Sequence, residues 1–154
     1  MATFPAIAVD LEGLESCIGA TAGPGPWLAV DQGRIGQFAD VTEDHQWIHV
    51  DPQRAAAGPF GGTVAHGYLT LSLIPRLIED LIAVDGVTMG VNYGLNKVRF
   101  PASVPAGSRV RASVELMDVT RVSGGAQLQV RVIVESDVQE RPVCVAEVVF
   151  LYFS

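Results

Sequence analysis

The sequence contains only two cysteines, Cys17 and Cys144, which lie far apart in the chain. They have neither the Cys-x-x-Cys spacing of many metal and redox sites nor the density of a disulfide-linked scaffold. Both lie among apolar or small residues. We therefore expect two buried free thiols in a protein of the reducing cytosol.

The sequence also lacks a long uninterrupted apolar segment. Residues 68–84 come nearest, but a proline and three charged residues interrupt them, so they do not predict a membrane span. The first ten residues, MATFPAIAVD, have no basic region followed by a long apolar run. They do not predict an export signal, and we expect a cytoplasmic protein that does not enter a membrane.

Positive charge is scarce, since 10 basic residues stand against 17 acidic ones and the net charge is -7. This balance argues against general binding to nucleic acids or anionic membranes. Hydrophobic residues make up 49% of the chain, so it must fold compactly. With 154 residues and no linker or repeat, we assign residues 1–154 to a single domain with a sizeable core.

The front of the chain is polar and rich in turns. We expect a short helix over residues 8–18, a first strand near residues 26–30 and a helical turn from Gln32 to Phe38. Residues 55–67 contain four glycines and a proline, which predicts a loop.

One long helix is predicted over residues 67–83. Its first half is apolar nearly all round, as in a helix that a sheet buries. Pro75 lies inside it and removes a backbone hydrogen bond to Leu71, which costs about 3 kcal/mol in an ordinary helix interior. We expect a kink or a break there.

After residue 86 the hydrophobic period changes to two. Apolar and polar residues alternate in SRVRASVELM and in QLQVRVIVE, which predicts strands with one buried face, and Gly124 and Gly125 between them predict a hairpin turn. VCVAEVVFLYF is apolar on both faces apart from Glu147, as in a central or interface strand. With TMGVNYGLNKVRF, these runs predict the α+β class, an antiparallel sheet with one long helix laid on it.

Ionisable side chains crowd into VTEDHQWIHVD, residues 41–51, which holds two of the three histidines. Asp51 and Pro52 are typical of a helix start. Asp44 and His49 have apolar neighbours that would draw them toward the core, where each needs a polar partner. The cheapest partner for each is the other or a bound water, and such a pair can exchange protons near neutral pH.

The same stretch has the His-x-x-x-His spacing of a zinc-binding helix. The zinc-protease motif, however, needs glutamate where Gln46 stands, and an amide cannot act as a general base. We expect neither a metal ion nor an organic cofactor.

Three ordered segments resemble one known family. FADVTEDHQWIHVDPQRA, VAHGYLTLSL and VRFPASVPAGSRV are similar to the motifs of MaoC-like dehydratases, the (R)-specific enoyl-CoA hydratases, and DHQWIH resembles the NodN-type subgroup. The resemblance runs from about residue 25 to the C-terminus. It implies a hot-dog fold, in which an antiparallel sheet wraps a long central helix.

The resemblance also implies roles for individual residues. Asp44 and His49 match the Asp and His that hold the water added to a trans-2-enoyl thioester, and we favour Asp44 as the principal base. His66 and Gly67 match a His-Gly pair at the substrate. The Gly67 N–H would stabilise the charge that develops on the thioester oxygen, although a glycine here also suits a plain helix start.

Two positions depart from the family pattern. Gln46-Trp47 replaces Asn-Pro, which makes Trp47 a candidate for lining the acyl pocket. Pro75 stands where many members have a serine that bonds the catalytic Asp. The remaining candidates for orienting that Asp are Ser72, Asn92 and Tyr93.

An acyl-CoA substrate also needs a site for its phosphates. Lys97, Arg99, Arg109 and Arg111 supply four of the 10 basic residues. They form either the solvent face of a strand pair or, as a group, an anion site, for which we favour Lys97 and Arg99. The resemblance further implies a homodimer with continuous sheets and an acyl tunnel near the subunit boundary.

The sequence thus predicts an (R)-specific enoyl-CoA hydratase that yields (R)-3-hydroxyacyl-CoA by acid-base catalysis. Two alternatives remain open. One is a hot-dog acyl-CoA thioesterase, and the other is a non-catalytic hot-dog domain that binds acyl-CoA or lipid.

Overall fold

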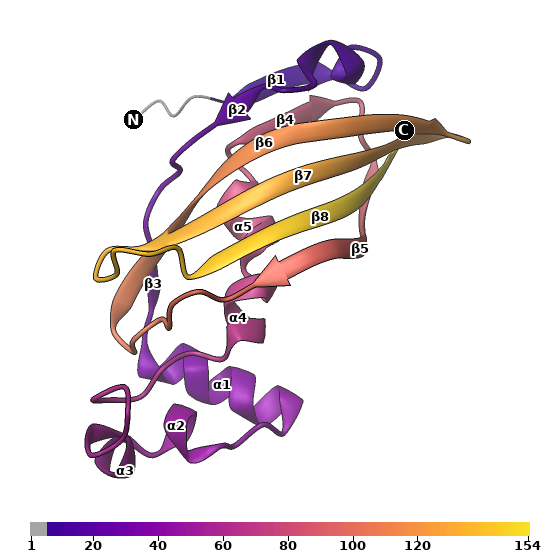
Figure 1. Cartoon of the computed structure of the whole chain (residues 1–154). Helices are drawn as coiled ribbons and strands as arrows, with labels where there is room; N and C mark the ends of the chain where they lie inside the picture. Colours follow the sequence, from indigo (N-terminus) through magenta and orange to yellow (C-terminus); the bar gives the residue numbers. More distant parts are fainter. Residues whose placement is uncertain (1–5) are drawn as a thin grey trace.

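The main element of the computed structural model, which describes residues 6–154, is an antiparallel sheet (Figure 1). Its strands lie in the order β2-β6-β7-β8-β5, and β3 also pairs with β6. Since β8 lies between two neighbours, the central strand predicted from its apolar sequence is confirmed. The strand bounds are Thr21–Ala22 (β2), Leu28–Val30 (β3), Met89–Arg99 (β5), Ser108–Val122 (β6), Gly125–Ser136 (β7) and Cys144–Phe153 (β8).

The period-two pattern correctly predicted the buried face of β6 and β7. The apolar residues of both strands that were expected to point inward are 0–3% exposed. Val122 pairs with Gly125, and Gly124 occupies the turn with φ +77°, a conformation that glycine adopts without strain. The predicted hairpin is therefore confirmed.

The predicted long helix is divided into α4 (Gly67–Ser72) and α5 (Ile74–Ile78). Pro75 lies in the first turn of α5, where a missing N–H has little cost, so the predicted break is confirmed. The prediction that the helix continues to residue 83 is wrong, because α5 ends at Ile78 and the strand β4 (Ile82–Asp85) follows. Leucines and isoleucines of α4 and α5 share one core with the inward valines of the sheet, and this burial stabilises the layers.

The predicted helix over residues 8–18 is wrong. The segment forms β1 (Ile7–Asp10), which pairs in parallel with β4, and a short 3-10 helix, η1 (Leu14–Cys17). Arg121, near the end of β6, donates to the carbonyl oxygens of Leu11 and Glu12 and to the Glu15 carboxylate. The partners of this segment lie more than 70 residues away, so its local pattern could not reveal them.

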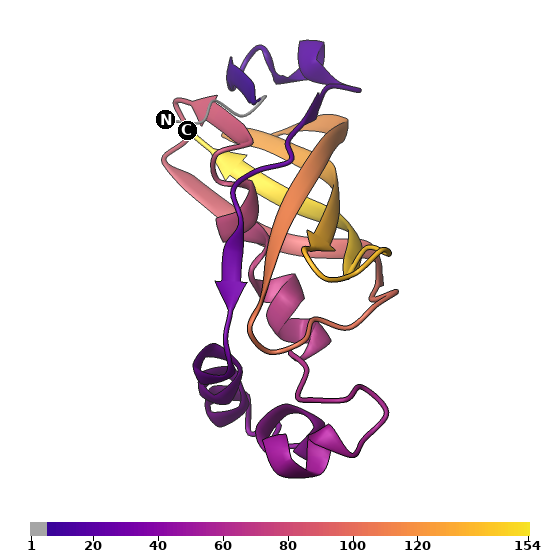
Figure 2. The ribbon, with the colours of Figure 1, turned by 90° about the vertical axis from the view of Figure 1, so that its left-hand side faces the viewer.

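Three helices form a separate layer at one end of the sheet (Figure 2). They are α1 (Gln32–Thr42), α2 (Trp47–Val50) and α3 (Pro52–Ala56). The α1 helix begins where a helical turn was predicted but continues beyond Phe38. Asp51 accepts a hydrogen bond from the Arg54 N–H at 3.0 Å with Pro52 at the first helical position, which confirms the predicted helix start.

Both cysteines are free thiols, with Cys144 buried and Cys17 partly buried. Burial raises the pKa of the Cys144 thiol to about 11, which keeps it unreactive near neutral pH. Within residues 6–154, no helix has the length and apolarity that crossing a bilayer requires. The predictions of one domain and of no export signal include residues 1–5, which lie outside the described part of the chain.

Candidate active site

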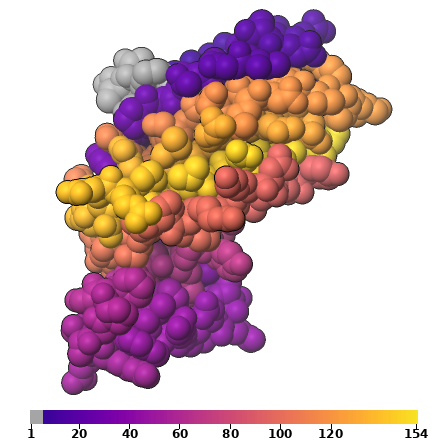
Figure 3. Space-filling view, viewed as in Figure 1, coloured from indigo at the N-terminus to yellow at the C-terminus, as the bar shows by residue number. Residues whose placement is uncertain are grey.

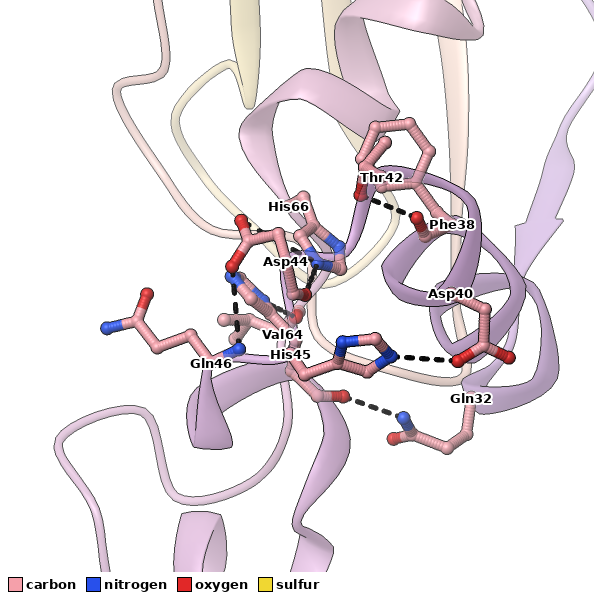
Figure 4. Close-up of polar contacts among 10 residues, drawn as sticks. Gln32, Phe38, Asp40, Thr42, Asp44, His45, Gln46, Val64 and His66 are labelled. Carbon is pink, nitrogen blue, oxygen red and sulfur yellow. Dashed lines mark hydrogen bonds and ion pairs between the residues drawn. The ribbon is translucent and has the colours of Figure 1, made fainter.

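Asp44, His49 and His66 come together from three separate segments, and Figure 4 shows Asp44 beside His66. Asp44 follows α1, His49 lies within α2, and His66 immediately precedes α4. One side-chain nitrogen or oxygen atom from each residue lies within 4.8 Å of the other two. His49 and His66 are 7% and 3% exposed, whereas the Asp44 side chain is 55% exposed. The structure thus brings Asp44 to His49, and it adds His66.

His49 has a defined tautomer. Its Nδ1 lies 2.6 Å from the carbonyl oxygen of Val64, and since a carbonyl can only accept, Nδ1 carries the hydrogen. The neutral ring therefore has its lone pair on Nε2. Burial lowers the pKa of His49, and His66 lowers it further, while the Val64 carbonyl and Asp44 oppose the shift. The ring is consequently available as a neutral proton acceptor near pH 7.

His66 links the other two residues of the cluster. Its Nε2 donates to the backbone carbonyl of Asp44 at 2.9 Å, and its ring stacks on that of His49 with centroids 3.8 Å apart. Phe38 also packs against it. The lone pair is then on Nδ1, which is buried and has no hydrogen-bond partner among the described residues. His66 thus holds the Asp44 backbone and supports the His49 ring.

The Asp44 carboxylate is oriented by its own turn. Glu43 ends α1 with φ +59°, and the Gln46 N–H donates to Asp44 Oδ1 at 3.4 Å. The candidates Ser72, Asn92 and Tyr93 make no hydrogen bond to Asp44 in the described structure, and the Ser72 hydroxyl instead donates to the Tyr68 carbonyl. The role of the family serine is therefore not taken over by any of these three side chains.

Two residues that the sequence did not single out hold the His49 backbone. Gln32 Nε2 donates to the His49 carbonyl at 2.8 Å, and the hydroxyl of Thr63 donates to Gln32 Oε1. Thr63 is 7% exposed, and the next residue, Val64, donates its N–H to the Ile48 carbonyl at 3.0 Å. This Gln32–Thr63 pair holds the His49 backbone, in addition to the hydrogen bond that its ring makes, through contacts that the local sequence pattern does not predict.

His49 and Gly67 open into one cavity of about 430 Å³. Most of its wall is apolar, including Phe60, Phe100 and Val143. A Cβ on Gly67 would lie 2.9 Å from the Phe100 ring, so glycine allows this aromatic wall to pack against the start of α4. The packing role therefore stands beside the predicted role of the Gly67 N–H.

Two other side chains of the 41–51 segment, His45 and Trp47, do not line the cavity. His45 is exposed and bonds Asp40 at 2.9 Å, so it does not converge with His49 as a zinc-binding pair would. Trp47 packs under the Arg54 guanidinium, 4.5 Å from the ring centroid, and against Gly58. It is not among the residues that line the cavity.

The four basic residues proposed as an anion site lie on the outer face of the sheet. Lys97 and Arg99 flank Val98, which packs against the core, and Arg109 and Arg111 alternate with buried residues of β6. Arg109 pairs with a carboxylate at 2.9 Å and Arg111 with another at 2.5 Å. The arrangement matches the solvent face of a strand pair, and these four residues do not gather at the cavity.

Comparison with known proteins places this geometry in context. The MaoC-like domain family matches residues 14–138. The chain is 49% identical over 153 residues to the 3-hydroxyacyl-thioester dehydratase Z of Mycobacterium tuberculosis (strain H37Rv), covering 99% of both chains. It is 44% identical over 142 residues to Nodulation protein N of Rhizobium leguminosarum bv. viciae, covering 90% of this chain and 88% of the relative.

Solved structures share the fold. The monoamine oxidase regulatory protein of Archaeoglobus superposes with a TM-score of 0.75 at 24% identity, covering 97% of this chain and 98% of the other. The (R)-hydratase PhaJ1 of Pseudomonas aeruginosa superposes with a TM-score of 0.71 at 20% sequence identity, covering 89% of this chain and 82% of the other. A chain of the ChsH1-ChsH2 complex of M. tuberculosis superposes with a TM-score of 0.69 at 21% sequence identity, covering 89% of this chain and 98% of the other. The predicted hot-dog fold is confirmed.

The histidine environments predict opposite titration shifts. His49 should titrate below the ordinary value of 6.5, chiefly because burial disfavours its charged form, and His45 should titrate above 6.5, chiefly because it bonds Asp40. Imidazole nitrogen NMR over a pH series measures both midpoints and reports the tautomer, with His45→Gln and His49→Gln assigning the signals. A His49 ring that titrates above His45, or that carries its hydrogen on Nε2, would contradict this geometry.

Proposed function

Because the chain belongs to the MaoC-like dehydratase family, we propose that it is an (R)-specific enoyl-CoA hydratase. It adds water to a trans-2-enoyl-CoA to give (R)-3-hydroxyacyl-CoA, and it catalyses the reverse dehydration. The observation that most supports this proposal is the neutral ring of His49, which lines an apolar cavity and lies within 4.8 Å of the Asp44 carboxylate. The name of the M. tuberculosis relative, a dehydratase of 3-hydroxyacyl thioesters, supports the same reaction in the reverse direction.

The first step concerns the attacking water. His49 Nε2 and the Asp44 carboxylate are both hydrogen-bond acceptors. A ring nitrogen of His49 lies within 4.8 Å of an Asp44 carboxylate oxygen, so the two residues are close enough to share one water. Such a water directs its oxygen lone pairs toward C3 of the enoyl group. His49 is the buried base with a lone pair in place, so we assign it the transferred proton and assign Asp44 the orientation of the water. This reverses the preference for Asp44 that the sequence suggested.

The second step concerns the enolate. As the hydroxyl bonds to C3, the thioester oxygen gains negative charge, and the Gly67 N–H at the start of α4 would donate to it. The proton held by His49 then moves to C2, which completes the addition and restores the neutral ring. The apolar wall takes the acyl chain and keeps other water away from the reacting atoms.

We propose that the reaction uses neither a metal ion nor an organic cofactor. Asp44, His49 and His66 are spaced closely enough for one ion. However, His66 Nε2 carries the hydrogen that it donates to the Asp44 carbonyl, so it has no lone pair to offer a metal. Binding an ion through His66 Nε2 would therefore require breaking that bond.

The dyad is tested by hydration of crotonyl-CoA, followed by loss of the enoyl absorbance. Asp44→Asn and His49→Gln should each lower kcat at least about 100-fold, because each removes one of the two groups that hold the water. The double variant should lose much less than the product of the two effects, since the groups act together.

His45→Gln is the matched control for that experiment, because the His45 side chain lies at the surface, where it bonds Asp40. Its activity should be nearly unchanged, with circular dichroism showing equal folding of all variants. Full activity of either dyad variant would remove that residue from the mechanism. Release of free thiol would instead identify a thioesterase, and saturable binding without turnover a binding domain.

The Gln32–Thr63 pair is predicted to position His49 during turnover. Thr63→Val keeps the shape of the side chain but removes the donor to Gln32, so kcat should fall about tenfold with little change in KM. Thr63→Ser retains the hydroxyl and should restore most of the rate. If the valine and serine variants behave alike in steady-state assays, the hydroxyl does not position His49.

We further propose a homodimer that forms through β5. This strand ends the sheet, and it carries three exposed apolar side chains, Met89, Tyr93 and Leu95, which are 53%, 64% and 46% exposed. A strand edge with exposed apolar residues is prone to pair with another chain. Pairing of two β5 strands would make the two sheets continuous.

The dimer is tested by light scattering at micromolar concentration. The wild type should have twice the 16.3 kDa mass of one chain. Leu95→Arg should yield the monomer, because it would place a charge in the apolar contact. Val41→Arg, at an exposed position of α1, should remain dimeric. A monomeric wild type would overturn the assembly.

A further inference from the structure

A second cavity, of about 420 Å³, adjoins the one that contains His49. The segment from Pro101 to Ser103 lines both cavities. The loop between β7 and β8 lines the second cavity with Val138–Arg141, and Val143 just beyond lines the first. Figure 3 shows this yellow-orange loop beside the connection from β5 to β6, above the purple helices. The two cavities are therefore neighbours that share one wall.

The loop between β7 and β8 is fastened to that wall. Gln139 Nε2 donates to the Ser103 carbonyl at 2.9 Å. At the start of the loop, Asp137 accepts hydrogen bonds from the backbone and the guanidinium of Arg109 at 2.8 and 2.9 Å. These contacts hold the loop residues in a defined place beside the cavity that contains His49.

Arg141 is the only arginine or lysine among the described residues that lines either cavity. No carboxylate of residues 6–154 lies within ion-pair distance of its guanidinium, whereas ion pairs occupy five other arginines. In a protein with a net charge of -7, an unpaired guanidinium at a cavity is a local site for an anion. Its planar donors suit a phosphate.

We propose that Arg141 binds the phosphate at the end of the pantetheine arm of the thioester substrate. This phosphate is common to coenzyme A and to acyl carrier protein. The inference rests on the proposed function, because the acyl end of the same substrate would lie in the cavity of His49. It also replaces Lys97 and Arg99, on the outer face of the sheet, as the anion contact.

Three crotonyl thioesters test the assignment: those of coenzyme A, of 4′-phosphopantetheine and of pantetheine, which lacks the phosphate. Arg141→Gln should raise KM about tenfold for the first two, as expected for losing a charge-assisted hydrogen bond, with kcat nearly unchanged. Kinetics with the pantetheine thioester should stay the same. Arg141→Lys should recover part of the loss, because it keeps the charge.

Two further variants sharpen the comparison. The double variant Lys97→Gln/Arg99→Gln should leave every KM unchanged, and Glu140→Gln should lower KM for the phosphorylated substrates, because it removes a negative charge next to Arg141. The wild-type ratio of kcat/KM for crotonyl-CoA and crotonyl-acyl carrier protein then identifies the carrier. If Arg141→Gln raises KM for both the coenzyme A and the acyl carrier protein thioesters, the result supports a contact with the phosphate that the two carriers share.

An unchanged KM for crotonyl-CoA in Arg141→Gln would overturn the proposal. An equal rise with the phosphate-free thioester would also overturn it, since that pattern indicates a displaced loop. A rise for crotonyl-CoA alone would assign Arg141 to the nucleotide end and refute the pantetheine phosphate. Calorimetric titration with 4′-phosphopantetheine measures the contact without turnover. Weaker binding in Arg141→Gln supports the contact even if the wild type fails to hydrate crotonyl-CoA, a failure that would count against the proposed function alone.

Discussion

The hydrogen bond from His49 Nδ1 to the Val64 carbonyl is the contact on which the candidate site depends. It sets the tautomer, and with it the atom that can accept a proton. It also joins α2 to the loop before α4, since Val64 donates to Ile48 in return. Further backbone bonds join that loop to the connection between β5 and β6, from Ala65 to Val104 and from Ala106 to Thr63. These bonds fix the position of the His49 imidazole relative to the sheet, although His49 belongs to a helix of one turn.

Features that depend on local periodicity could be predicted from the sequence. Alternation along β6 and β7 identified their buried faces, and Pro75 identified the break between α4 and α5. Features that depend on distant partners could not. β1 becomes a strand because β4 offers it an edge, and Thr63 matters because folding brings it to Gln32, 31 residues away. Neither pairing can be predicted from the residues adjacent to it in the sequence.

The sequence predicted the histidine and aspartate of the candidate site but not its proposed anion contact, and the reasons are similar. Asp44 and His49 stood out because a polar pair among apolar neighbours must find partners. Lys97 and Arg99 were grouped because they are close in the chain, yet their alternation with Val98 already indicated a shared outward face. The division of roles within the dyad could not be predicted, because it depends on burial: His49 is enclosed, whereas half of the Asp44 side chain faces solvent.

The junction at Leu73 gives the central helical segment two separable parts. Since Pro75 has no N–H, the backbone ladder that would bind α5 to α4 as one rod is incomplete there. A cavity of about 290 Å³ lies beside this junction, between Leu71, Pro75 and the Leu95 region of β5. Substitutions around α5 can therefore change the volume of this cavity while the first turn of α4, which begins at Gly67 after His66, keeps its place. The size of this cavity and the placement of His66 are thus set by different parts of the helical segment.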